Sequence, residues 1–217
     1  MKTDPQLKTD VSDELFWDPS INATHIGVIV SGGVVTLTGH LGTFAEKHAA
    51  ERAVRRVSGL RGIALELDVK LAPAHKRSDS EIAQAAASAL RWHSLVPDGS
   101  VMVEVEESRV TLTGEVTWDY QLRSAEQCVW PLVGVRGLNN RITVKPQVST
   151  EDIGSQISAA LGRQAAREAK HIRIDVKGGV VTLNGAVHSL AERDAAVGVA
   201  YSARGVSTVV DRLEVSP

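Results

Sequence analysis

One five-residue pattern occurs three times in this chain and constrains its fold more than any other feature. It stands at residues 35–39 (Val-Thr-Leu-Thr-Gly), again at 110–114, and at 181–185 with asparagine in the fourth place. In every copy a leucine lies 24 residues before the final glycine of the pattern, and another glycine lies 20 residues after it. Three matches at two fixed distances indicate three tandem copies of one small domain. The leucines are Leu15, Leu90 and Leu161, and the later glycines are Gly59, Gly134 and Gly205.

The repeat divides the chain of 217 residues into units of about 70 residues each. We predict domains at residues 1–72, 77–146 and 149–217, joined by short polar linkers. A domain of this size buries only about 60% of its unfolded surface, so it is marginally stable alone. We therefore expect the units to draw part of their stability from one another or from a partner.

Each unit has the same predicted order of elements: helix, strand, strand, helix, strand. In the first unit, residues 26–30 alternate in polarity as a half-buried strand does, and two glycines at 32–33 allow a tight turn. The pattern strand then pairs back antiparallel. Helices are predicted at residues 9–17 and 44–57, and a last strand at 63–69. The units together predict an α+β fold in which a three-stranded mixed sheet packs on two helices in every domain.

The later units depart from the first in three places. The second unit has Glu107 and Ser108 where the others have paired glycines, so we expect a looser turn or one of another type. Pro131 is expected to end or kink the second helix of that unit. The first helix of the third unit is predicted to run from residue 149 to about Ala169, which makes it longer than its equivalents.

The glycine that ends each pattern has a predicted structural role. Val35 and Leu37 face the same side of the strand as Gly39, because side chains alternate along a strand. A side chain at the glycine would block something that packs close, and its presence in all three copies supports this steric interpretation. The later glycine of each unit is expected to end the second helix in a left-handed cap. The predicted structural glycines are Gly39, Gly114 and Gly185 in the pattern and Gly59, Gly134 and Gly205 at the caps.

Charge is balanced within each unit, which argues against a nucleic-acid partner. Residues 1–75 hold 8 Lys/Arg against 9 Asp/Glu, residues 76–148 hold 8 against 9, and residues 149–217 hold 8 against 8. Binding to a polyanion needs a basic excess. The single cysteine, Cys128, excludes an internal disulfide and a multi-cysteine metal site. The first ten residues lack the apolar stretch of a signal peptide, and no run of about 18 apolar residues occurs. We expect no transmembrane segment and a cytoplasmic location, or a periplasmic one if a targeting segment has been removed.

Nothing in the sequence predicts catalysis. The seven histidines show no His-x-x-x-His spacing, and none recurs at an equivalent place with an acidic partner. No nucleophile-elbow motif occurs, and the glycines at 32–33 join two strands, so they do not form a phosphate-binding loop at the start of a helix. We expect no catalytic residue, no metal site and no cofactor.

The scarce aromatic residues are candidates for a binding surface. Trp17 and Trp92 each lie 22 residues before their pattern glycine, and Arg163 takes that place in the third unit. Each tryptophan either caps the core of its unit or is an exposed anchor for a lipid interface or a neighbouring unit. Trp118 and Tyr120 occur only in the second unit, at the start of its second helix. That restriction indicates a contact with a partner or another unit, with simple packing as the alternative.

Basic residues form two further candidate stripes, one near the end of the second helix of the first unit and one along the first helix of the third unit. Each Lys or Arg near an anionic membrane contributes about 1 kcal/mol, so four of them would support weak, salt-sensitive binding. A solvated helix face is the alternative. The first stripe is Arg52, Arg55, Arg56 and Arg61, and the second is Arg163, Arg167, Lys170 and Arg173.

Units of this size and element order, with a Val-Thr-Leu-x-Gly strand and a Gly-Val break before the last strand, resemble the BON domain of bacteria. The resemblance covers essentially the whole chain and is strongest at residues 33–39, 59–62, 118–121, 134–137 and 179–185. Members of this family are generally non-catalytic and associated with phospholipid surfaces or envelope stress. The resemblance therefore implies a binding protein whose partner is an anionic phospholipid surface, and it carries over no catalytic residue. The alternative is a soluble scaffold that binds other proteins between its units.

Overall fold

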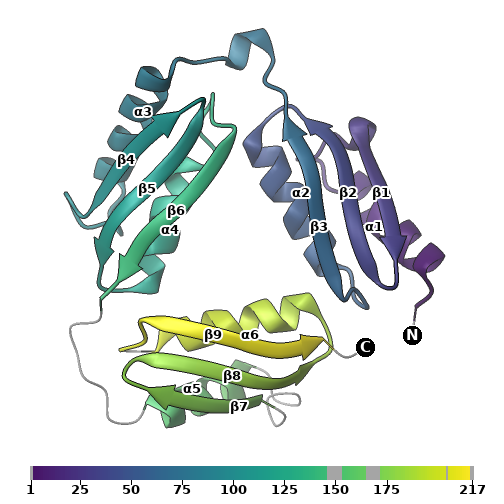
Figure 1. The fold of residues 1–217 in the computed structure, drawn as a ribbon, viewed down its shortest axis with the longest axis vertical. Helices are drawn as coiled ribbons and strands as arrows, with labels where there is room; N and C mark the ends of the chain where they lie inside the picture. The colour runs from purple at the N-terminus through teal and green to yellow at the C-terminus, as the bar shows by residue number, and fades with distance from the viewer. Residues whose placement is uncertain (1, 146–152, 165–171, 204, 216–217) are drawn as a thin grey trace.

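The computed structural model describes residues 2–145, 153–164, 172–203 and 205–215, with the backbone alone for residues 162–164. Within these residues the chain forms three domains of the same build, each with helix, strand, strand, helix and strand in that order (Figure 1). The prediction of three tandem α+β domains with three-stranded sheets is confirmed.

The elements follow one scheme in all three domains. The first domain consists of α1 (Asp4–Trp17), β1 (Ile26–Ser31), β2 (Val34–Leu41), α2 (Phe44–Arg56) and β3 (Gly62–Val69). The second consists of α3 (Asp79–Trp92), β4 (Val101–Glu106), β5 (Arg109–Val116), α4 (Asp119–Val129) and β6 (Gly137–Val144). The third consists of α5 (Ile153–Gln164), β7 (Ile172–Lys177), β8 (Val180–Val187), α6 (Leu190–Ser202) and β9 (Thr208–Val215). Two short 3-10 helices, η1 (Ala23–His25) and η2 (Pro73–His75), lie in connecting segments.

The repeated pattern forms the central strand of every sheet. β2 pairs antiparallel with β1, where Val28 lies opposite Leu37, and parallel with β3, where Leu37 lies opposite Leu65. β5 and β8 occupy the same central place in their own sheets. Val35 and Leu37 are completely buried. Each sheet is therefore mixed, and its pattern strand supplies the middle of the core.

A close backbone approach accounts for the glycine at the end of the pattern. Gly39 has a φ of 116°, and a Cβ built on it would lie 1.9 Å from the carbonyl oxygen of His25. Gly114 has a φ of 140°, and its Cβ would lie 2.1 Å from the carbonyl oxygen of Ser100. In both domains the obstructing carbonyl belongs to the residue just before the first strand of the hairpin. A residue with a side chain would therefore force the two strands apart.

The turn between β4 and β5 shows that one prediction was wrong. Glu107 and Ser108 have φ values of 49° and 63°, close to the 58° and 79° of Gly32 and Gly33 in the equivalent turn. The turn is therefore of the same kind and not a looser one. The carboxylate of Asp79, at the start of α3, accepts hydrogen bonds from both backbone N–H groups, at 2.9 and 2.8 Å. These bonds hold a left-handed conformation that side chains at both positions disfavour.

Helix α1 begins earlier than predicted, at Asp4 instead of residue 9. The backbone N–H of Thr3 donates to the side-chain oxygen of Gln6 at 2.9 Å, which satisfies one of the free donors at the start of the helix. The added turn buries Leu7 in the core. In the third domain α5 ends at Gln164 within the described residues, and its predicted extension to Ala169 lies outside them.

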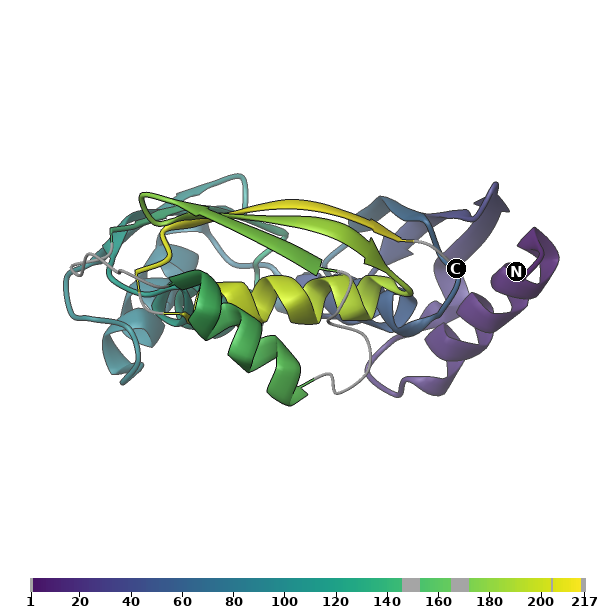
Figure 2. The same cartoon turned by 90° about the horizontal axis from the view of Figure 1, so that it is seen from below.

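The three domains are arranged as a ring (Figure 1). All three sheets lie on one side of the ring and the helices lie on the other (Figure 2). The second helix of each domain (α2, α4 and α6) lies on the inner side of the ring (Figure 1). The inner edge strands of the sheets are β3, β6 and β9, and the outer edge strands are β1, β4 and β7. Helices α1 and α5 slope away from the sheets, so their C-terminal ends lie far from the sheet layer (Figure 2).

Each domain has its own core, but two large side chains cross from one domain to the next. Phe44, the first residue of α2, packs against the core of the second domain. Leu190, the first residue of α6, belongs to the core of the first domain and is only 6% exposed. These apolar contacts add buried surface that a single domain of this size lacks.

Candidate functional site

The described residues offer little for catalysis. Among them, no group of three His, Cys, Asp or Glu side chains could hold a metal ion. His25 and His40 stack with their ring centres 4.6 Å apart, and partial burial, followed by nearby Lys70 and His25, lowers the pKa of His40. The thiol of Cys128 donates to a backbone carbonyl at 3.3 Å, and burial raises its pKa. It is therefore less reactive than a free thiol.

The first candidate surface is formed by the two equivalent tryptophans. Trp17 and Trp92 are the last residues of α1 and α3, and their exposed fractions are 84% and 85%. The interpretation that they cap the core is therefore wrong. Leu7, Val11 and Leu15 form the buried stripe of α1, spaced four residues apart. Trp17 follows Leu15 by two residues, so it projects away from that stripe.

Other apolar side chains extend this exposed surface in both domains. Phe16 is 84% exposed next to Trp17, and Leu95 is 50% exposed just beyond Trp92. Exposed side chains of this size and number at one structural position indicate an interaction surface. No helix in the parts of the chain that the structure describes is long and apolar enough to cross a membrane.

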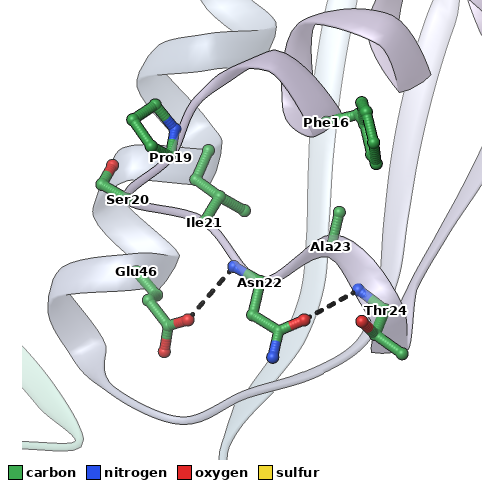
Figure 3. Close-up of a pocket in the computed structure, with 8 residues that line it drawn as sticks. All are labelled: Phe16, Pro19, Ser20, Ile21, Asn22, Ala23, Thr24 and Glu46. Atoms are coloured by element: carbon green, nitrogen blue, oxygen red, sulfur yellow. Dashed lines mark hydrogen bonds between the residues drawn. The ribbon is translucent and has the colours of Figure 1, made fainter.

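A pocket of about 510 Å³ lies beside Phe16, between the end of α1 and the loop that leads to β1 (Figure 3). Its only acidic side chain, Glu46, accepts a hydrogen bond from the backbone N–H of Asn22 at 3.2 Å and another from the hydroxyl of Thr43 at 3.3 Å. Asn22 in turn accepts from the backbone N–H of Thr24 at 3.2 Å. These polar groups hold the loop, and their bonds leave no free acid or base aimed into the pocket.

The remaining predicted residues fall into two groups. Trp118 and Tyr120 stack on each other with ring centres 6.5 Å apart, and Tyr120 is 50% exposed. Arg163 lies in α5, but its side chain is not among those described, and Arg167 and Lys170 lie outside the described residues.

Two arginines of the first basic stripe form ion pairs within the protein. Arg55 forms ion pairs with Glu51 at 2.9 Å and with Asp194 of the third domain at 3.1 Å. Arg56 forms ion pairs with Glu14 at 2.6 Å and with Asp18 at 3.3 Å. Two of the four positive charges in this stripe are therefore already partnered by carboxylates.

The second candidate is the junction where the three domains meet, which the sequence did not reveal. Counting from the pattern glycine, the ninth residue of one domain contacts the sixteenth residue of the next, and this relation holds all the way around the ring. The first contact is a stack, the second places a guanidinium over a ring, and the third is an ion pair. They are His48 with Trp130 (4.7 Å between ring centres), Arg123 with Tyr201 (5.6 Å) and Asp194 with Arg55 (3.1 Å).

A similar relation holds for the fifth residue after the pattern glycine, at the start of each second helix. Phe44 and Leu190 occupy this place in the first and third domains and pack against a neighbouring core. The second domain has Asp119 there, which is buried and paired with Arg123 at 2.6 Å. Burial raises the pKa of Asp119, and the neighbouring Arg123 partly offsets this shift. Two of the three residues at this place therefore pack against a neighbouring core, whereas Asp119 pairs within its own helix.

A pocket of about 750 Å³ opens at the junction and has walls from all three domains. Its first wall is one stripe of α2, its second wall is the facing stripe of α4 with Leu138 of β6, and Tyr201 of α6 closes it. Its charged and aromatic lining residues are Phe44, His48, Arg52, Asp119, Arg123, Glu126, Trp130 and Tyr201. No motif marks these residues, because equivalent positions carry different side chains in each domain.

A family model described as the BON domain matches residues 3–70, 78–146 and 149–217. The chain is 31% identical over 118 residues to an uncharacterized protein in the gshII 5' region of Anaplasma centrale, which covers 51% of this chain and 78% of that protein. It is 26% identical over 144 residues to Osmotically-inducible protein Y of Escherichia coli (strain K12), which covers 63% of this chain and 72% of that protein.

Among solved structures, the chain is similar to CdsD, a structural protein of the type III secretion system of Chlamydia trachomatis. The sequence identity is 13%, the match covers 96% of this chain and 91% of that chain, and the TM-score is 0.25. A TM-score this low carries no argument about the domain arrangement or the function of this chain.

Proposed function

Because this chain belongs to the BON domain family, with three copies of the domain, we propose that it is a non-catalytic binding protein that associates with phospholipid surfaces of the cell envelope in a stress-related role. The stress-related part rests on its similarity to Osmotically-inducible protein Y. The lipid-binding part rests on one observation about this chain. Two tryptophans at the same place in two domains, Trp17 and Trp92, are 84% and 85% exposed.

Physical arguments favour a lipid interface for these side chains. An indole ring has a large apolar area and a polar N–H, which suits the boundary between headgroups and acyl chains. Full removal of one such ring from water is worth up to about 5 kcal/mol at 25 cal/mol per Å². Phe16 and Leu95 add apolar area next to the two tryptophans. Insertion of two sites on one chain would also gain from bivalent attachment.

The chain offers less for electrostatic attraction. Arg55 and Arg56 are paired with carboxylates, and the overall formal charge is −2. Vesicle binding should therefore depend more on the two tryptophans than on anionic lipid content. The sequence suggested an anionic phospholipid surface as the partner. The structure favours a phospholipid surface whose negative charge contributes less to binding than its apolar interior does.

The test is co-sedimentation with vesicles of neutral lipid and of neutral lipid mixed with anionic lipid, at low and high salt. Trp17→Ser and Trp92→Ser should each weaken binding about tenfold, and the double substitution should remove it. Met102→Ser is the matched control, because Met102 is 68% exposed but lies on β4, on the sheet side of the molecule. Its binding should equal that of the unmodified chain.

The absence of binding to both vesicle types at low salt would rule out the lipid partner. A pull-down would then test the alternative, a scaffold that binds proteins between its domains. That alternative has less support, because the surfaces between domains are already occupied by the chain's own contacts, among them His48 with Trp130 and Arg55 with Asp194.

A further inference from the structure

The junction pocket combines opposite charges with an apolar wall, and these features together define a ligand. Phe44, His48 and Arg52 are spaced four residues apart on α2, so they form one stripe that faces the pocket. The opposite wall is α4, where Leu122, Glu126 and Trp130 line the pocket. A single small molecule can therefore touch two helices of different domains and Tyr201 of the third.

Two of the four charged side chains that line the pocket are already paired with each other. Asp119 and Arg123 form an ion pair at 2.6 Å, and the guanidinium of Arg123 also lies over Tyr201. Two charges are different, since neither the guanidinium of Arg52 nor the carboxylate of Glu126 has a hydrogen-bond or ion-pair partner among the described residues. They also form no ion pair with each other, although both line the same pocket.

A third polar group lies in the same place without a partner. The Nδ1 atom of His48 is buried and has no hydrogen-bond partner among the described residues. Its ring is held by the stack on Trp130, so this atom cannot easily turn toward solvent. A buried polar atom without a partner is costly, and a bound ligand is one way in which such an atom is satisfied.

We propose that the junction pocket binds a small zwitterion with an apolar body. The carboxylate of the ligand pairs with Arg52, its ammonium group pairs with Glu126, and the apolar body lies against Phe44, Leu122 and Trp130. A purely anionic ligand would face the carboxylate of Glu126, and a purely cationic ligand would face the guanidinium of Arg52. Only a molecule that carries both charges satisfies both walls.

Binding at this place has a structural consequence. The ligand would contact all three domains at once, so it would stabilise the closed ring over any arrangement in which the domains separate. The unfolding temperature should therefore rise with ligand concentration, and the radius of gyration should not increase.

The experiment compares three probes that share one apolar body. L-Phenylalanine carries both charges, 3-phenylpropionate lacks the ammonium group, and 2-phenylethylamine lacks the carboxylate. Calorimetric titration of the full chain should give saturable binding of L-phenylalanine, about tenfold tighter or more than either of the other probes. The indole N–H resonance of Trp130, assigned with Trp130→Phe, should shift during the titration.

Substitutions then assign the two charges. Arg52→Gln and Glu126→Gln should each weaken the binding of L-phenylalanine about tenfold or more. Arg91→Gln is the matched control, because Arg91 is an exposed arginine on α3, outside the junction, and it should leave the affinity unchanged. The double substitution Trp17→Ser/Trp92→Ser should also leave it unchanged, so this site is tested separately from lipid binding.

Three results would overturn the proposal. The first is the absence of saturable binding of L-phenylalanine to the full chain. The second is equal affinity for all three probes, which would show that the two charges do not select the ligand. The third is unchanged affinity in both Arg52→Gln and Glu126→Gln with circular dichroism that matches the unmodified chain.

Discussion

The central strands and the inner faces of the second helices differ in how they vary across the three domains. The strands keep valine, leucine and glycine at the same places in every copy. On the helices, the ninth residue after the pattern glycine is His48, Arg123 or Asp194, and the sixteenth is Arg55, Trp130 or Tyr201. A strand faces the core of its own domain, which is the same in each copy. A helix faces a neighbouring domain, which differs at each contact.

The difference indicates how the order of domains around the ring is specified. Each observed pair at the junction is complementary, as in Asp194 with Arg55 or His48 with Trp130. A different order would place Arg123 against Arg55, and two like charges in contact oppose binding. The repeated residues therefore specify the domain, and the variable residues specify which domain is its neighbour.

The largest expected effect is at the glycine that ends the repeated central strand. Gly39→Ala should destabilise the protein by about 3 kcal/mol or more, because it combines an unfavourable φ with a backbone clash. The clash is with the carbonyl oxygen of His25, 1.9 Å from the added Cβ. Urea unfolding measures the change. Gly62→Ala is the control in the same sheet, since its Cβ would meet Val34 at 3.6 Å, and it should change stability by less than about 0.5 kcal/mol.

The next effect concerns the one hairpin turn that lacks glycines. Asp79→Ala removes both hydrogen bonds to the turn and should cost about 2 kcal/mol in unfolding free energy. Glu107→Gly with Ser108→Gly should instead stabilise the protein by about 1 kcal/mol and reduce the cost of Asp79→Ala.

The first domain provides the matched control for this turn. Asp4 accepts the same two hydrogen bonds, at 2.8 and 2.9 Å, from glycines that adopt the turn without strain. Asp4→Ala should therefore cost less than Asp79→Ala in the same unfolding assay. An equal cost would mean that the bonds, and not the backbone preference, dominate both turns.

The contacts at the junction should have smaller effects that differ in their response to salt. A double-mutant cycle with His48→Ala and Trp130→Ala should give a coupling of about 1 kcal/mol that salt does not change. The cycle with Arg55→Ala and Asp194→Ala should give about 0.5 kcal/mol at low salt and close to zero at high salt, because this pair is partly exposed. Equal salt dependence in the two cycles would contradict this assignment of the contacts.

The smallest expected effect is a pH dependence at His40. Its pKa in the folded protein lies below the unfolded value of about 6.5, mainly because of partial burial and then because of Lys70 and His25, while Asp68 opposes the shift. As the pH falls below about 6.5, the unfolded chain binds a proton first, so stability decreases until the folded-state pKa is passed. His40→Gln should remove this decrease, and NMR titration should show His40 titrating below its value in the unfolded chain.

The repeat made most of the fold predictable. Spacing identified the three units, and polarity periods with turn and cap residues gave the order of elements in each unit. That the pattern strand is the central strand of each sheet came from the structure. Prediction was wrong at the turn of Glu107 and Ser108, because the aspartate that supports it lies 28 residues away from Glu107. It missed the first turn of α1, where apolar residues are sparse and the cap comes from Thr3 and Gln6.

The candidate sites were less predictable than the fold. The sequence identified Trp17 and Trp92 as equivalent but left open whether they were core or surface residues. Their exposure depends on which face of the helix packs against the core, and the sequence did not settle that at the end of the helix. It gave no indication of the junction pocket, because Arg52 and Glu126 lie 74 residues apart and only the packing of domains brings them to one place.

The sequence by itself determined three domains of one kind, the order of their elements and the glycines that their hairpins require, because those features follow from patterns that recur along the chain. Only the tertiary structure decided that the domains close into a ring, that two tryptophans face solvent and that three unlike side-chain pairs meet at its centre. The reason is physical: a contact between domains depends on the shape and charge of two surfaces at once, and neither surface appears as a pattern along the chain.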